Sequence, residues 1–322
     1  MIGRVLVTGA TGFVGSALVA RLSNDSRYKV RAAVRRSNWR SASAIEVARV
    51  SELAANADWG ASLHDVQYVV HTAARVHVMQ DRASDPLQEY RRCNVDGTLA
   101  LARQAAEHNV RRFVFISSIK VNGESTPAGK PFRADDTPRP VDPYGISKLE
   151  AEAGLKEIAS STGMELVIIR PPLVYGPGVG ANFRRLMQWL HAGTPLPFGA
   201  IDNRRSLVGI DNLIDLIIRT LDHSAATGRV LLASDDEDLS TTSLMRRLAL
   251  HLRCPARLFP VPAAVLRLGA ALVGKSATIS RLCDSLQLDV SETRRVLDWT
   301  PPVGLDEGLS RTAAEFLNET PD

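Results

Sequence analysis

The chain has 322 residues and a formal net charge of +4, with 45% hydrophobic and 23% charged residues. This balance excludes an intrinsically disordered chain, and its length suits one large α/β domain with a smaller appendage. The arginines are spread along the sequence instead of forming basic runs, so we expect no nucleic-acid partner.

Short apolar runs alternate with helical patterns through the first half of the chain. We predict helices directly after the first strand, at about 86–108 and at 143–160, and strands at 4–9, 29–34, 45–50, 66–74, 111–118 and 165–171. Strands that alternate with helices indicate a parallel sheet covered on both faces. We therefore expect a Rossmann-type, doubly wound α/β domain over residues 1–172, with some later segments returning to it.

Helical patterns dominate beyond residue 172. They fall at 182–192, 211–222, 240–251, 262–273, 291–297 and 305–317. We interpret residues 173–322 as a smaller, mostly helical substrate-binding domain near the carboxyl ends of the strands, where ligands bind in such folds.

The stretch TGATGFVG places Gly9, Gly12 and Gly15 between the first strand and the first helix. Glycines there permit a tight turn and a close approach of backbone N–H groups to a pyrophosphate, so we predict a dinucleotide site. At the end of the second strand, Arg35 and Arg36 stand where an NAD site would have an acidic residue, and this favours NADP(H) over NAD(H). Glu52, just past the third strand, is a possible adenine contact.

Ser117 and Ser118 end the fifth predicted strand, and Tyr144 and Lys148 lie on one face at the start of the next helix. Both segments reach the carboxyl edge of the sheet. A phenol can act there as acid or base in hydride transfer, although its ordinary pKa of about 10 is too high for a base at neutral pH. We expect the Lys148 ammonium to favour the phenolate, and Ser118 to hydrogen-bond the substrate oxygen.

With TGATGFVG, HTAA, NVDGT, ISSIKVNG and PYGISK in this order, the chain resembles the extended short-chain dehydrogenase/reductase family, in its nucleotide-sugar epimerase/dehydratase/reductase branch. The likeness extends from RVLVTG to RRVLDWTPP. It implies that Ser118, Tyr144 and Lys148 are catalytic and that Asn94 supports the site. It also implies that the cofactor contacts Phe13, Val14, Ala73, Ala74, Pro171 and Val174.

The same resemblance implies a nucleotide-sugar substrate. Asn182 and Arg205 match residues that bind the diphosphate, and Arg281 or Asp289 would complete the pocket. Ile119 and Lys120 replace the Asp-Glu pair of the family's 4,6-dehydratases, so we do not expect dehydration; we place Lys120 among the substrate-binding residues. Two reactions remain. Reduction of a UDP-4-keto-6-deoxy-N-acetylhexosamine in surface polysaccharide biosynthesis is favoured, and a UDP-sugar 4-epimerase is the alternative.

Other interpretations stay open at this point. A non-catalytic dinucleotide-binding regulator would commonly lack the tyrosine or the lysine, and a steroid or flavonoid reductase would lack the pair Asn182 and Arg205.

The apolar run at 262–274 is too short to span a bilayer, yet it could associate with a membrane or a polymerase complex. The three cysteines lack metal-ligand spacing and no signal peptide is recognisable, so we expect a cytoplasmic protein. The resemblance further implies a homodimer through the helices at 86–108 and 143–160.

Overall fold

The protein is described here from a computed structural model, which covers residues 3–35, 45–50, 52–76, 85–272, 274 and 276–319, without the side chains of 276–278. Its centre is a seven-stranded sheet in which every neighbouring pair is parallel. In spatial order the strands are β3 (Glu46–Arg49), β2 (Tyr28–Val34), β1 (Gly3–Thr8), β4 (Tyr68–His71), β5 (Arg112–Ile116), β6 (Glu165–Arg170) and β9 (Val230–Leu232). The strand order reverses between β1 and β4, which marks the ligand crevice of a doubly wound sheet. The predicted fold class is confirmed.

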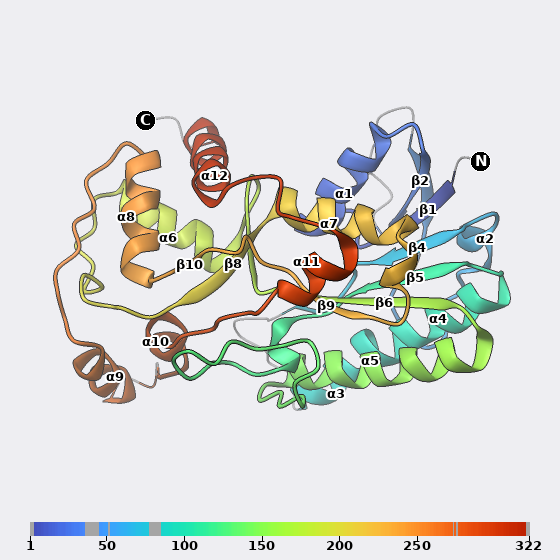
Figure 1. Cartoon of the computed structure of the whole chain (residues 1–322), viewed down its shortest axis with the longest axis horizontal. Helices are drawn as coiled ribbons and strands as arrows, with labels where there is room; N and C mark the ends of the chain where they lie inside the picture. The colour runs from blue at the N-terminus through green and yellow to red at the C-terminus, as the bar shows by residue number, and fades with distance from the viewer. Residues whose placement is uncertain are drawn as a thin grey trace.

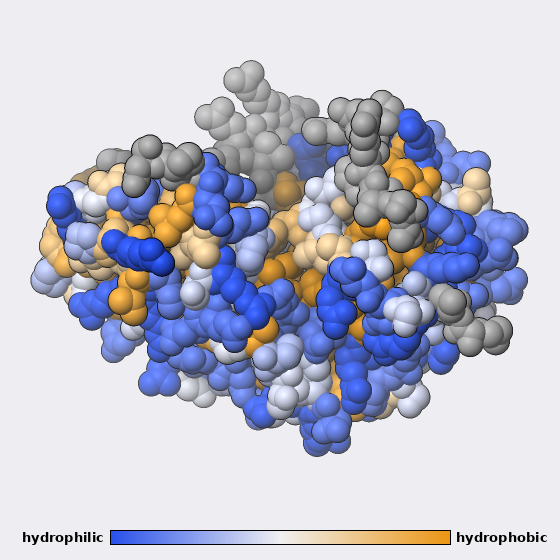
Figure 2. Space-filling model, turned by 90° about the horizontal axis from the view of Figure 1, so that it is seen from above, coloured by the Kyte–Doolittle hydropathy of each residue, from blue (hydrophilic) through white to orange (hydrophobic). Residues whose placement is uncertain are grey.

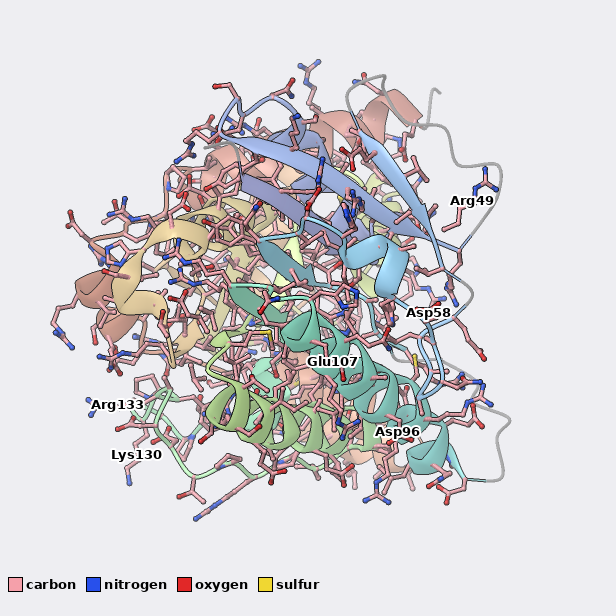
Figure 3. The ribbon with its side chains drawn as sticks, turned by 90° about the vertical axis from the view of Figure 1, so that its right-hand side faces the viewer. Arg49, Asp58, Asp96, Glu107, Lys130 and Arg133 are labelled. Atoms are coloured by element: carbon pink, nitrogen blue, oxygen red, sulfur yellow. The ribbon has the colours of Figure 1, made fainter. Side chains whose placement is uncertain are left out.

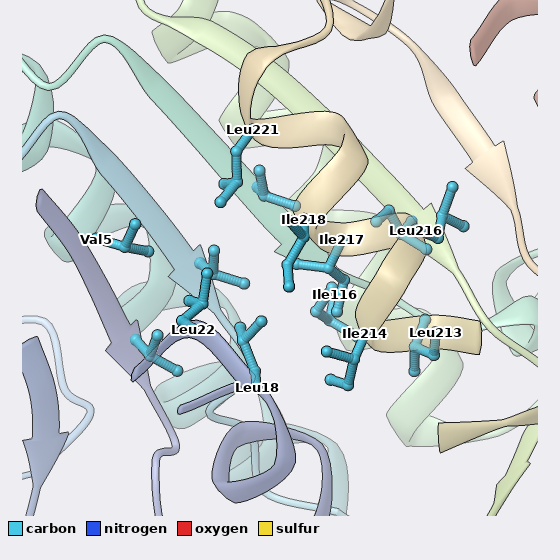
Figure 4. Close-up of a cluster of buried hydrophobic side chains, with 14 of the residues drawn as sticks. Val5, Leu18, Leu22, Ile116, Leu213, Ile214, Leu216, Ile217, Ile218 and Leu221 are labelled. Atoms are coloured by element: carbon cyan, nitrogen blue, oxygen red, sulfur yellow. The ribbon is translucent and has the colours of Figure 1, made fainter. Parts of the chain in front are cut away.

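Helices cover both faces of this sheet (Figure 1). On one face α1 (Phe13–Ser23) and α7 (Ile210–Asp222) pack together, and Figure 4 shows their leucines and isoleucines meeting Val5 and Ile116 of the strands. On the other face lie α2 (Gly60–Leu63), α4 (Thr98–Glu107) and α5 (Pro143–Thr162). Successive strand residues alternate between the two cores, because side chains of a strand point to opposite faces.

The predicted helix at 86–108 is divided into three parts. These are α3 (Pro86–Tyr90), a π-helical segment η1 (Arg91–Gly97) and α4. The long helix α5 packs against all three. Whether these helices pair across a two-fold axis stays a prediction.

A second lobe lies beyond the carboxyl ends of the strands (Figure 1). Its three-stranded sheet joins β10 (Asp238–Leu239), β8 (Arg205–Gly209) and β7 (Leu173–Tyr175). Around this sheet lie α6 (Ala181–His191), α8 (Thr241–His251), α9 (Ala263–Leu272), α10 (Ser276–Cys283) and α12 (Leu305–Glu319), and most of these helices contribute to a separate apolar core. The segments α7, β9, η3 (Ser224–Ala226) and α11 (Ser291–Leu297) pack back on the larger lobe. The division at residue 172 stays a prediction.

The surface shows how the two lobes meet. Figure 2 shows a depression between them in which hydrophobic side chains reach the surface. Figure 3 shows another side of the molecule, and the six charged residues labelled there are exposed: Arg49, Asp58, Asp96, Glu107, Lys130 and Arg133. Among the described residues, no helix combines the length and apolarity that crossing a membrane requires.

Candidate active site

The glycine-rich turn after β1 lets a ligand approach the backbone closely. Gly9 has a φ of +65°, which a side chain would disfavour. A Cβ added at Gly15 would lie 2.1 Å from the carbonyl oxygen of Gly9, so only glycine fits there. Exposed Gly12 precedes the first residue of α1, and the turn therefore presents the amino end of an 11-residue helix to the crevice. This arrangement fits the pyrophosphate of a dinucleotide.

Several predicted cofactor contacts gather around this turn. Phe13, Val14 and Val174 are half-buried against the same apolar core. Ala73 follows β4, where its amide donates to the Thr8 hydroxyl at 3.3 Å, and Ala74 is half-buried beside it. Pro171 is buried, and its carbonyl accepts from the Ile119 amide at 3.0 Å.

The residues predicted to select the cofactor's ribose lie farther out. Arg35 is exposed directly after β2, and Glu52 is exposed beyond β3. Arg36 lies outside the described residues. For Arg35 and Glu52, contact with a nucleotide stays a prediction.

Asn94 joins two segments of the site. Its side-chain oxygen accepts from the Arg75 amide at 2.8 Å, and its amide nitrogen donates to the Ser147 hydroxyl at 3.0 Å. Ser147 in turn donates to the carbonyl of Tyr144 at 2.8 Å. Asn94 lies within the π-helical segment η1, a rare backbone form that is frequent at functional sites. It therefore ties the loop after β4 to the first turn of α5.

Ser118, Tyr144 and Lys148 come to one edge of the sheet. Ser118 follows β5, and Tyr144 and Lys148 lie in the first turns of α5. That helix begins as predicted, with Asp142 capping the Gly145 amide at 2.7 Å. A Cβ at Gly145 would lie 2.9 Å from the carbonyl of Lys120, so the start of α5 directly contacts the segment after Ser118.

The electrostatics of this group differ from our expectation. The Lys148 side chain is buried, its Nζ donates to the Ile116 carbonyl at 2.9 Å and lies 4.4 Å from the centre of the Phe115 ring. Burial lowers the pKa of Lys148 to about 8. Burial also raises the pKa of Tyr144 above its ordinary value, and the nearby Asp142 and Tyr90 add to the rise. The expected lowering of the Tyr144 pKa by Lys148 is thus not confirmed by the protein groups alone.

Sequence reasoning missed a buried network directly behind the site. Glu152, one turn beyond Lys148, forms an ion pair with Arg170 at 2.6 Å, and both side chains are almost fully buried. The Ser117 hydroxyl donates to Glu152 at 2.5 Å, and Arg170 donates to the Asn122 side chain at 2.9 Å. The sequence contains a signal for this network. Arg170 ends the apolar strand β6, and a buried arginine requires an acidic or polar partner.

His71 is a second missed residue. It is fully buried at the end of β4, between the hydroxyls of Thr8 at 2.7 Å and Thr98 at 2.9 Å. Burial, with a contribution from Lys148, lowers its pKa to about 3, so this imidazole is neutral at pH 7. Its ring stacks on Phe115, which also faces the Lys148 ammonium. His71 therefore supports the Phe115 ring, against which the Lys148 ammonium packs.

Lys120 lies among other charges at the front of the site. Its ammonium pairs with Asp142 and, at 2.9 Å, with Glu124. Glu124 in turn lies 4.0 Å from the guanidinium of Arg281, so a row of alternating charges connects α10 to the N-cap of α5.

The remaining predicted substrate residues belong to the second lobe. Arg205 begins β8 and donates to the Asp284 carbonyl at 2.9 Å; burial lowers its pKa. Asn182 is exposed in the first turn of α6 and makes no side-chain hydrogen bond within the described part of the chain. Asp289 pairs with Arg133 at 3.2 Å. An open hollow of about 650 Å³ next to Asp284 is lined by residues 125–127, 201–203, 263, 267 and 283–285.

Comparisons with known proteins agree with this geometry. A protein-family model described as "NAD dependent epimerase/dehydratase family" matches residues 5–233. A UDP-glucose 4-epimerase of Vibrio cholerae is 47% identical over 314 residues, which cover 97% of this chain and 95% of that protein. The solved structure of MoeE5 with UDP-glucose and NAD has a TM-score of 0.78 at 27% identity and covers 99% of this chain and 100% of its own.

A further solved structure supports the fold alone. UDP-glucuronic acid 4-epimerase from Bacillus cereus, in complex with NAD, has a TM-score of 0.80 at 23% identity, covering 98% of this chain and 96% of its own. The family described is NAD-dependent, so the preference for NADP that Arg35 and Arg36 suggested is not supported. As the motifs from TGATGFVG to PYGISK predicted, the chain belongs to the NAD-dependent epimerase/dehydratase family and is an enzyme.

Proposed function

We propose that this enzyme inverts C4 of a UDP-sugar with NAD as its cofactor. The observation that carries the proposal is the 47% identity to a UDP-glucose 4-epimerase over almost the whole chain, together with Ser118, Tyr144 and Lys148 at one sheet edge. The reductase that the sequence favoured is the second candidate, and the comparisons give it less support. Its remaining basis is the segment ISSIKVNG, with Lys120 in ion pairs at the front of the site.

The residues have distinct tasks in this proposal. The phenol of Tyr144 takes the proton from the C4 hydroxyl and returns it after the keto-sugar has turned, while Ser118 holds the same oxygen. The turn of Gly9, Gly12 and Gly15 would hold NAD, which would supply the hydride acceptor and donor that the reaction at C4 requires. Because burial and Asp142 raise the Tyr144 pKa, the phenol depends on an additional positive charge to ionise near neutral pH.

Lys148 and the second lobe provide binding. The Lys148 ammonium, held by the Ile116 carbonyl, would reach the ribose hydroxyls of the cofactor and orient it. Arg205, Arg281 and Asn182 would bind the diphosphate and nucleoside, and Asn94 would keep the first turn of α5 in place. Neither Ile119 nor Lys120 supplies the acidic pair needed for water elimination, so dehydration is not proposed.

The test supplies UDP-sugars and 4-keto-UDP-sugars with and without NADPH. Interconversion of two C4 epimers without added reductant supports the proposed epimerase. Net consumption of NADPH with a 4-keto-sugar would refute it and identify the enzyme as a reductase. Tyr144→Phe should abolish turnover while NAD still binds. The control Tyr68→Phe removes a phenol that instead hydrogen-bonds Asp222 at 2.9 Å, and it should remain active.

A further inference from the structure

An apolar stripe on α9 of the second lobe is left exposed by the described residues, on the helix whose Ala263 and Arg267 line the hollow next to Asp284. In α9, Val265 is 56% exposed, Leu268 is 68% exposed and Leu272 is 82% exposed. Their spacing of three and four residues places them on one side of the helix. Phe259, in the segment leading into α9, is 46% exposed. Large aliphatic side chains gathered in this way mark a contact surface rather than scattered surface residues.

The segment of sequence that carries this stripe is basic. Residues 239–283 contain seven lysines and arginines and no aspartate or glutamate, which leaves −3 for the rest of a chain whose net charge is +4. Arg267 is neutralised by Asp284 at 2.7 Å. Arg253 and Arg257 are exposed and form no ion pair within the described part of the chain. They belong to the link from α8 to α9, which runs along the outer edge of the second lobe (Figure 1).

We propose that this edge, made of Arg253, Arg257, Phe259 and the exposed side of α9, docks on an anionic phospholipid bilayer. The helix lies in the plane of the interface with its leucines at the boundary between headgroups and acyl chains, and the arginines contact the acidic headgroups. Ten residues of helix are about 15 Å long, which suits a surface position and cannot span the membrane.

The charge distribution favours this occupant over a second copy of the chain. Two copies facing each other through this edge would bring unpaired arginines together, and like charges repel. An anionic lipid surface is complementary to both the arginines and the apolar stripe. Because the stripe is short, we expect weak, reversible binding that falls as salt rises. The inference does not depend on the proposed sugar chemistry.

The experiment sediments the full chain with vesicles of phosphatidylcholine, with and without phosphatidylglycerol. We expect binding only to the anionic vesicles, weakened by salt. The double variant Leu268→Ser/Leu272→Ser should bind roughly tenfold or more weakly, because two side chains no longer enter the apolar phase. Arg253→Gln/Arg257→Gln should lose part of the dependence on phosphatidylglycerol.

The matched control is Val47→Ser, which alters an apolar side chain that is 40% exposed on the β3 edge of the large sheet and should bind as the wild type does. All variants are first compared by thermal unfolding, since changes at exposed positions should leave the fold intact. Three results would each overturn the proposal: wild-type protein that stays in the supernatant at low salt, a leucine double variant that binds like the wild type, or an oligomer that the leucine changes dissociate.

Discussion

Removing Arg170 should destabilise the protein severely, because it leaves the buried Glu152 without its ionic partner. The two side chains form a bidentate pair, with nitrogen–oxygen distances of 2.6 and 2.9 Å, and their exposed fractions are 2% and 0%. Loss of one partner of a buried pair costs about 3–5 kcal/mol. For Arg170→Met we therefore expect the free energy of unfolding, measured by urea titration with circular dichroism, to fall by about that amount.

Two comparisons make this prediction refutable. Glu152→Met/Arg170→Met should recover much of the loss, because no unpaired charge is buried in the double variant. Arg229→Met breaks a pair of 3.1 Å whose side chains are 47% and 44% exposed, and it should cost less than about 1 kcal/mol. If Arg170→Met costs no more than Arg229→Met, or if the double variant merely sums its single changes, the network behind Ser117 does not hold the site as argued.

Three further predictions concern the site itself. Burial lowers the pKa of Lys148 from 10.5 to about 8, so the unfolded chain binds that proton more tightly and the free energy of unfolding should rise by about 3 kcal/mol between pH 8 and pH 10.5. Lys148→Met should abolish this rise in urea titrations at several pH values. Lys120→Met leaves the Asp142 carboxylate uncompensated beside Tyr144, so the acidic limb of the kcat profile should move to higher pH, whereas Lys120→Arg should keep the wild-type profile. Gly15→Ala places a Cβ 2.1 Å from Gly9 and should abolish NAD binding in calorimetry, whereas Gly304→Ala, with nothing within 4 Å, should not.

The parallel sheet and the turn after β1 were predictable because their signals are local. The apolar runs of β1, β4 and β5 are each followed by a helical pattern, and Asp142 and Pro143 mark the start of α5 in the sequence. The strand β9 was missed, since Val230–Leu232 is only three residues long and joins β6 from about 60 residues away. The π-helical turns of Arg91–Gly97 were also missed, because an apolar pattern does not distinguish them from an ordinary helix.

The candidate site was predictable in its members and less so in its interactions. Spacing alone places Tyr144 and Lys148 on one helix face. It does not show that the ammonium turns to the Ile116 carbonyl and the Phe115 ring, because both belong to a strand whose position depends on the whole sheet. The same holds for Glu152 and Arg170, which meet only once α5 packs over β6.

The burial of Lys148 connects stability with function. An ammonium held by one carbonyl and one aromatic face keeps two donors that these contacts do not use, and its lowered pKa shows that the folded protein holds the charge at a cost. A methionine would fill such a space without that cost. A cation that costs stability at the carboxyl edge of the sheet supports the proposal that the remaining donors of Lys148 bind the cofactor, since enzyme sites commonly trade stability for activity.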